Sequence, residues 1–228
     1  EIDLPESGFK TAHRGPGYPF FLSLIYRAVP DQHRFGWARI IQAALMAGLA
    51  PLTAMIAFRG GFSARSAQLA GYAAAVYPLW IVYPLGLASE NLFIPLLGCS
   101  YLSLLASSRP RLARDSLRSG ILLGATMLTR SVVALFLPLS AWWTAKSRHQ
   151  KRTLSLLMFA VAVGLTLPWA FRNSVLLGKP TYLESSLGYN LFISYHPDGD
   201  GGFIHEIATL PLKFFDDPSR MAYTTPQA

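Results

Sequence analysis

Residues 66–89 read SAQLAGYAAAVYPLWIVYPLGLAS, a stretch of 24 residues without a charged side chain. Three further charge-free stretches of similar length cover residues 40–58, 91–108 and 153–171. A helix needs about 20 apolar residues to cross the hydrocarbon core of a bilayer, which is about 30 Å thick. The four stretches therefore predict an all-α protein, a polytopic transmembrane helical bundle. A large soluble helical core is the less favoured alternative.

The charged residues are few and unevenly placed. The chain is 52% hydrophobic and only 14% charged, whereas a soluble domain carries about 25% charged residues. Much of its net charge of +8 comes from the connections between apolar stretches, which contain Arg59, Arg65, Arg109, Arg111, Arg114, Arg118, Lys146, Arg148, Lys151 and Arg152. Cytoplasmic loops of membrane proteins carry such an excess. We therefore interpret the charge as a topology signal and not as a nucleic-acid interface.

The basic connections define a topology when they are placed in the cytoplasm. The predicted spans cover about residues 40–58, 66–88, 91–107 and 153–171. Between the last two of these spans lies an apolar segment with Arg130 near its middle. One helix there would bury Arg130 and would move the next basic cluster to the outside, against the positive-inside rule. We therefore predict a hairpin of two short helices, 119–129 and 131–145, with Arg130 at its outer tip; a single long helix is the alternative.

This topology places both ends of the chain outside the cytoplasm. Residues 1–36 are predicted to form an extracytoplasmic loop, with an amphipathic juxtamembrane helix from Tyr18 to Val29 at the membrane interface. Residues 37–171 form the transmembrane region, with about six membrane segments, and residues 172–228 form a second extracytoplasmic segment. Because no signal peptide precedes the first loop, the chain is expected to be a fragment with a further span upstream.

Four charged side chains fall at the outer ends of the predicted helices: Arg14, Glu90, Arg130 and Arg172. Ionisable groups at membrane depth are costly and usually functional. Three guanidinium groups near one carboxylate suit a phosphate or pyrophosphate, because a guanidinium binds phosphate oxygens through two parallel hydrogen bonds. The alternative for each residue is a charge that merely ends a helix.

Several stretches, in this order, resemble one family. They are RGPGYPFFLSLIY (14–26), ASENLF (88–93), LLGATMLTRSVV (122–133), LPWAFRN (167–173), GKPTYLESSLGYNLF (178–192) and HPDGDGGF (196–203). Together they resemble the polytopic glycosyltransferases of the GT-C superfamily. The most similar group is the bacterial relatives of protein O-mannosyltransferases and of the lipid A aminoarabinose transferase, which are glycosyltransferase family 39-like.

The resemblance implies a reaction and a place for it. Such enzymes transfer a sugar from a polyprenyl-phosphate carrier to an acceptor outside the cytoplasm, here a protein, lipid or glycan. This chain would then be a multi-pass protein of a bacterial inner membrane with its active site on the extracytoplasmic face. The partners are the lipid-linked donor, membrane lipids and the acceptor. No cofactor is required by the resemblance, and a divalent metal is left open.

The resemblance also assigns roles to single residues. Glu90 matches an acidic catalytic residue that follows a later span. Arg14 matches the basic residue before a Pro-rich turn, and Arg14, Arg130 and Arg172 would stabilise the departing phosphate. Tyr18 and Asn190 are assigned to substrate binding. The family's first acidic residue is expected upstream, because Asp3 lacks the preceding span and the family context. This fragment is therefore expected to lack its principal base and to be inactive as a glycosyltransferase.

Two other functions remain open. A transporter or flippase of a phosphate-containing lipid would use the same arginines to hold a headgroup, but a carrier needs polar groups near the middle of the membrane. A non-catalytic membrane subunit would tolerate replacement of Glu90 and of the arginines. The sugar, the acceptor and the stereochemical outcome are not specified by the sequence.

Overall fold

The computed structural model describes residues 12, 14–105, 113–146, 152–184 and 195, which contain helices and no strand. The prediction of an all-α protein is confirmed for this part of the chain. Its α-helices are α1 (Gly17–Ala28), α2 (Arg34–Ala47), α3 (Leu49–Arg59), α4 (Ala64–Ala75), α5 (Pro78–Val82), α6 (Glu90–Leu105), α7 (Ala113–Thr129), α8 (Phe136–Lys146) and α9 (Arg152–Leu177). Three 3-10 helices, η1 (Asp31–His33), η2 (Tyr83–Leu85) and η3 (Ser131–Leu135), join them.

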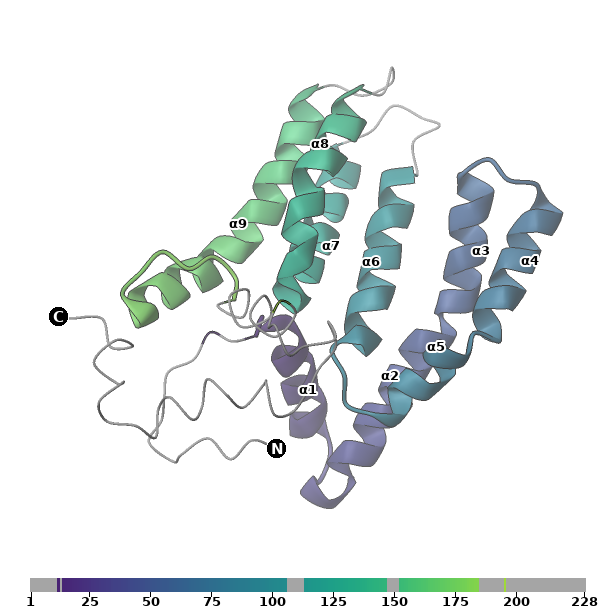
Figure 1. Ribbon diagram of the computed structural model, residues 1–228, viewed down its shortest axis with the longest axis horizontal. Helices are drawn as coiled ribbons and strands as arrows, with labels where there is room; N and C mark the ends of the chain where they lie inside the picture. Colours follow the sequence, from purple (N-terminus) through teal and green to yellow (C-terminus); the bar gives the residue numbers. More distant parts are fainter. Residues whose placement is uncertain (1–11, 13, 106–112, 147–151, 185–194, 196–228) are drawn as a thin grey trace. The chain divides into compact units, whose positions relative to one another are not determined.

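The chain divides into two compact units, Glu1–Glu184 and Ser185–Ala228. The helices named above belong to the first unit, whose helical arrangement is drawn in Figure 1. Of the second unit the structure describes Tyr195. Helix α9 continues past residue 171 to Leu177, and the segment after it packs back on α9.

The predicted break at Arg130 is present. Helix α7 ends at Thr129, Arg130 has an extended backbone with φ −146° and ψ 119°, and η3 leads into α8. The far end of α8 returns to the start of α9, where Thr144 Oγ1 donates a hydrogen bond of 3.0 Å to Ser155 Oγ. The predicted position of the turn, at Arg130, is therefore confirmed. Helix α7 begins at Ala113 and not at residue 119 as predicted. Both α7 and α8 pack against α9.

The second predicted span, over about 66–88, is wrong as a single helix. Helix α4 ends at Ala75, and Tyr77 is extended with ψ 117° before Pro78 begins α5. Proline has no N–H for the helical ladder and disfavours the α conformation in the residue before it. The 12 residues of α4 reach about 18 Å, which is shorter than a hydrocarbon core of about 30 Å.

Contacts between helices show which helix ends lie together. Asn91, at the start of α6, hydrogen-bonds Gln42 of α2, and Gly98, two turns later, lies against Leu52 of α3. Helices α2, α3 and α6 therefore run in the same direction. Ser100 of α6 hydrogen-bonds Thr126 near the end of α7, so α6 and α7 are antiparallel.

Helix α7 runs parallel to α9, because Gly120 lies against Met158 and Gly124 lies against Ala162. The first unit consequently has two different ends. We call one the Glu90 end; it contains Glu90, Arg130 and the end of α9 near Arg172. We call the other the basic end; it contains Arg59, Arg114, Lys146 and Arg152. In Figure 1 the basic end is the upper side of the first unit, where α3, α6 and α8 end.

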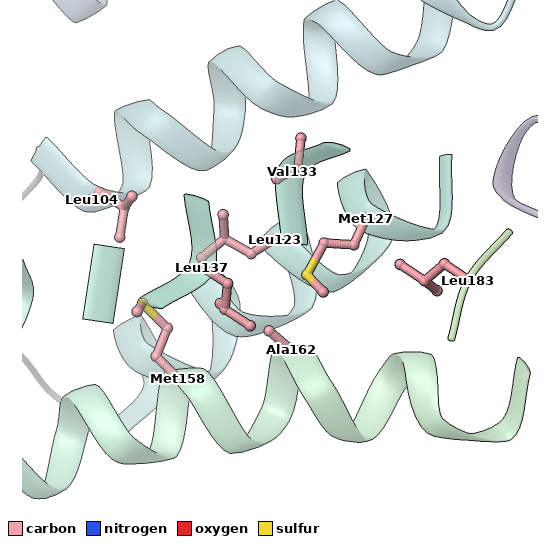
Figure 2. Close-up of a cluster of buried hydrophobic side chains, with 8 residues drawn as sticks. All are labelled: Leu104, Leu123, Met127, Val133, Leu137, Met158, Ala162 and Leu183. Atoms are coloured by element: carbon pink, nitrogen blue, oxygen red, sulfur yellow. The ribbon is translucent and has the colours of Figure 1, made fainter. Parts of the chain in front are cut away.

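The helices meet through small and polar residues. Gly120 and Gly124 form a GxxxG pattern in α7, and a Cβ added at Gly120 would lie only 2.7 Å from the carbonyl oxygen of Met158. Such glycines let two helix backbones approach closely. Around this contact lies the buried apolar cluster of Figure 2, which consists of Leu104, Leu123, Met127, Val133, Leu137, Met158, Ala162 and Leu183.

The distribution of polar and apolar side chains is unusual for a water-soluble protein. Buried polar side chains include Gln42, Asn91, Ser100, Ser116, Ser119, Thr126, Thr129, Ser140, Thr144, Ser155, Thr166 and Asn173. Large apolar side chains are exposed along the same helices, among them Ile40, Met55, Phe58, Leu69, Leu139, Trp142, Leu156, Leu165, Phe171 and Val175. Soluble monomers rarely expose apolar surface on this scale.

Within the described residues, two helical segments are long and apolar enough to cross a membrane, Asp31–Arg59 and Arg152–Leu177. In each, only 22% of the most apolar window is buried inside the protein. A core helix of a soluble protein would be mostly buried, so these segments present their apolar side chains outward.

Candidate functional site

Glu90 and Arg130 form an ion pair at the Glu90 end. Arg130 Nη2 lies 3.0 Å from Glu90 Oε1, and the two side chains are 44% and 25% exposed. Ser89 Oγ donates to the other carboxylate oxygen over 3.2 Å, and the Arg130 guanidinium lies over the ring of Phe93, 5.8 Å from its centre. Glu90 is the first residue of α6, where the positive end of the helix dipole favours a carboxylate. The predicted acid and one predicted arginine are thus in direct contact.

A buried amide pair fixes the start of α6. Asn91 Nδ2 donates to Gln42 Oε1 over 3.0 Å and to the carbonyl oxygens of Tyr83 and Gly86 over 3.1 Å each. Asn91 and Gln42 are fully buried. A buried polar side chain with several partners is costly to displace. These bonds therefore hold the helix turn that carries Glu90.

Tyr18 joins the same network from α1. Its hydroxyl donates to Gln42 Oε1 over 2.7 Å, and its ring stacks on Phe21. Burial raises the pKa of Tyr18 to about 12, with smaller contributions from Tyr26 and Glu90. The phenol therefore stays neutral at physiological pH and keeps its proton for Gln42.

The Gly-Pro turn before α1 packs against the end of α7. A Cβ added at Gly15 would lie 2.3 Å from the carbonyl oxygen of Leu128, and one at Gly17 would lie 2.6 Å from Thr129 Oγ1. Only glycine allows so close an approach. The contact brings the exposed Arg14 beside the residues that directly precede Arg130.

The segment that follows α9 folds back to the hairpin tip. Trp169 Nε1 and Asn173 Nδ2 each donate to the carbonyl oxygen of Leu183 over 3.0 Å. The next residue, Glu184, accepts a hydrogen bond from Ser131 Oγ. The Glu184 carboxylate therefore contacts the residue that directly follows Arg130. Glu184 was not among the predicted site residues.

Arg172 lies near the end of α9 with local partners. Its guanidinium stacks over Trp169 at 4.4 Å, and Nη1 donates to Asn173 Oδ1 over 3.0 Å. Among the described residues, no contact joins Arg172 or Arg14 directly to Glu90 or Arg130. Asn190, also predicted to bind substrate, lies outside the described residues.

Sequence reasoning missed the polar residues that hold the site together. Gln42 lies inside an apolar stretch and Asn91 begins one, and only their contact across helices reveals their role. A usable signal did exist for both, since an amide inside a membrane-length apolar stretch requires a partner. Glu184 lies in one of the stretches on which the family resemblance rests, and the presence of a carboxylate there could have marked it as a candidate site residue.

The site contains groups for two kinds of chemistry. A carboxylate can accept a proton, and guanidinium groups can bind an oxyanion. The described residues contain no cluster of three or more His, Cys, Asp or Glu that could hold a metal. A comparison of the chain with protein-family models, curated proteins and solved structures found no match in any of the three. Function is therefore inferred from the residues of the site.

Proposed function

We propose that the first unit is a polytopic, membrane-embedded helical bundle. The support is its inverted distribution of side chains, with hydroxyls and amides inside and large apolar groups outside. In a bilayer, helices associate through small residues and hydrogen bonds rather than through apolar burial. The GxxxG contact of α7 with α9 and the hydroxyl pair Ser100–Thr126 fit this mode of packing.

The two ends of the bundle support an orientation. The basic end contains Arg59, Arg114, Lys146 and Arg152, and cytoplasmic connections are rich in such residues. The Glu90 end is then extracytoplasmic. In this orientation the Glu90–Arg130 pair faces the outer side of a bacterial inner membrane.

We propose that the chain is part of a glycosyltransferase that takes a sugar from a polyprenyl-phosphate-linked donor. The observation that carries the proposal is the Glu90–Arg130 ion pair at the Glu90 end. The Arg14 turn packs on the same helix terminus, and Arg172 lies near the end of parallel α9. Arg130 in contact with Glu90, together with Arg14 and Arg172 at the same end of the unit, would provide binding for a phosphate and a base for an acceptor.

The reaction follows from these groups. An acceptor hydroxyl oxygen attacks the anomeric carbon of the sugar and forms the new glycosidic bond. The bond between the anomeric carbon and the phosphate oxygen breaks, and its electron pair leaves with the polyprenyl phosphate. Glu90 accepts the hydroxyl proton, and Arg130, Arg14 and Arg172 stabilise the phosphate charge.

Binding of the donor to Arg130 would free Glu90 from the ion pair and allow it to act as a base. Arg130 has five N–H donors, and the phosphodiester monoanion of the donor would compete with Glu90 for them. Donor binding would therefore weaken the contact that holds Glu90 and leave its carboxylate able to accept a proton. Ser89 would continue to orient the carboxylate through its hydrogen bond.

Reconstitution of the protein in vesicles with a radiolabelled polyprenyl-phosphate sugar tests the function. We expect release of polyprenyl phosphate together with a labelled acceptor when a membrane extract supplies acceptors. Movement of intact donor across the bilayer without bond cleavage would instead identify a flippase. Neither cleavage nor movement, in a preparation that binds no donor, would identify a non-catalytic subunit.

A further inference from the structure

The connection between α1 and α2 borders an open polar hollow, apart from the Glu90–Arg130 pair. It has a volume of about 560 Å³ and is lined by residues 23, 26–31 and 34, including Arg27 and Arg34. Tyr26 and Ser23 add hydroxyl groups to its wall, and Asp31 adds one carboxylate. The function proposed above uses none of these residues.

Arg34 is held in place but is incompletely satisfied. Its Nη2 pairs with Asp31 Oδ1 at 2.5 Å, and its guanidinium lies over the ring of Tyr26 at 5.7 Å. Its Nε is buried and has no hydrogen-bond partner within the described part of the chain. An orphaned buried donor calls for an oxygen from a ligand or from water. Arg27, in the last turn of α1, is exposed beside it.

The hollow lies at the level of a lipid headgroup if the chain sits in a membrane as proposed. Arg34 precedes Gln42 by eight residues on the same helix, which is about 12 Å beyond the level of the Glu90 network. Next to it Phe35 and Trp37 are exposed. Exposed aromatic side chains of this kind gather at the boundary between the bilayer and water.

An exposed apolar stripe leads to the hollow along α1. Phe20, Leu24 and Arg27 recur at helical spacing on one face, and both apolar side chains are exposed. Residues three or four apart lie above one another on a helix. The stripe therefore offers apolar contact up to the point where the cationic group begins, which matches the order of acyl chain and phosphate in a phospholipid.

We propose that the α1–α2 connection binds the anionic headgroup of a phospholipid in the outer leaflet. Arg27 and Arg34 bind the phosphate, Tyr26 donates a hydrogen bond to a headgroup oxygen, and the Phe20–Leu24 stripe contacts an acyl chain. The Ser23 hydroxyl already donates to the carbonyl oxygen of Phe20. Asp31 opposes the ligand by its charge while it orients Arg34. The proposal rests on the membrane placement argued above and does not depend on sugar transfer.

Native mass spectrometry of the purified protein tests this site. Phosphatidylglycerol, phosphatidylcholine and inorganic phosphate are added in separate arms, and the retained ligand is titrated. We expect retention of phosphatidylglycerol in preference to phosphatidylcholine, and at least about a tenfold loss of affinity in Arg27→Gln/Arg34→Gln, because two charge-assisted contacts are removed. Arg39→Gln, which removes an exposed arginine of α2 outside the hollow, should retain the wild-type affinity.

Two further variants distinguish a loss of lipid binding from a loss of folding. Arg27→Gln alone leaves the Arg34–Asp31 pair intact and should still weaken retention of phosphatidylglycerol. Asp31→Asn should tighten it, because a repelling charge is removed. Equal retention by the wild type and the double variant would overturn the proposal, as would equal retention of phosphatidylcholine. Binding of inorganic phosphate with the same arginine dependence but no lipid would overturn the lipid assignment.

Failure here is distinguishable from failure of the proposed function. Loss of lipid retention with normal sugar transfer would remove only this site. Absence of sugar transfer with arginine-dependent lipid retention would leave this site in place and would overturn the glycosyltransferase proposal.

Discussion

Arg130 Nη2 lies 3.0 Å from Glu90 Oε1 and thereby joins the break after α7 to the first turn of α6. Both side chains are partly exposed, and an exposed ion pair contributes only about 0–1 kcal/mol to stability. The amide pair Gln42–Asn91 holds the same turn independently. Neutralising Glu90 is therefore expected to change the chemistry of the site far more than it changes the fold.

The turn that positions Arg14 depends on glycine. A Cβ at Gly15 would lie 2.3 Å from the carbonyl oxygen of Leu128, and overpacking of this kind costs about 1–3 kcal/mol. Gly15→Ala is expected to lower the free energy of unfolding by that amount. Gly36→Ala is the matched control, since nothing lies within 4 Å of its added Cβ, and it should be neutral or stabilising. Thermal unfolding in detergent measures both; equal behaviour of the two variants would refute the close contact.

The contact between α7 and α9 gives a second glycine prediction. A Cβ at Gly120 would lie 2.7 Å from the carbonyl oxygen of Met158 and 2.8 Å from Val161 Cβ. Gly120→Ala is therefore expected to separate the two helices and to lower the melting temperature. Gly164→Ala, on α9 with open space around the added Cβ, should not lower it. A Gly120→Ala protein as stable as the Gly164→Ala protein would argue against this packing.

These glycines mark a limit of sequence reasoning. GxxxG in α7 is visible in the sequence, and it could have predicted a close helix contact, although not that α9 is the partner. The role of Gly15 could not be predicted, because it depends on Leu128 in a distant helix. The break at Arg130 was predictable from a local cost, namely that of a charge in the middle of an apolar helix.

The proposed orientation of the first unit predicts the accessibility of single cysteines. In a Cys99→Ala background, Lys179→Cys, after α9, should react with a membrane-impermeant thiol reagent in intact cells. Ala113→Cys, at the start of α7 and the basic end, should react only after the cells are opened. Lys179 is preferred to Gly178, whose φ of 62° disfavours a side chain. The reverse pattern of labelling would invert the topology.

Tyr18 is expected to resist ionisation. Its pKa is raised from 10.0 to about 12, so the folded state favours the neutral phenol that donates to Gln42. Because the folded pKa lies above the unfolded one, this stabilisation is complete below pH 10 and is lost as the pH rises toward 12. The tyrosinate absorbance of the wild type minus that of Tyr18→Phe should show no ionisation near pH 10. A clear transition at pH 10 would mean that Tyr18 is solvated.

The sequence predicted the helices that coincide with charge-free stretches, and it missed one local break and the contacts between distant segments. Charge-free stretches predicted helices, and α6 and α9 lie where two of those stretches do. The second span failed because the prediction weighed hydropathy and not Pro78, where the helix breaks. A proline alone is not decisive, since Pro95 and Pro168 lie inside the continuous helices α6 and α9. The sequence predicted that Glu90 and Arg130 lie at the same ends of their helices, and the structure shows the two side chains in contact. Its support by Gln42 and its extension to Glu184 depend on contacts across the bundle.

The most direct measurement is the rate at which Glu90→Gln releases polyprenyl phosphate from the lipid-linked donor, compared with the wild type at equal amounts of folded protein. Gln keeps the shape of the side chain but cannot accept the acceptor's proton, so we predict a rate lower by at least about a hundredfold. Glu90→Asp should retain part of the activity. Asp115→Asn, which makes the equivalent change near the basic end, should release polyprenyl phosphate at the wild-type rate. Near-equal rates for Glu90→Gln and the wild type would contradict the account.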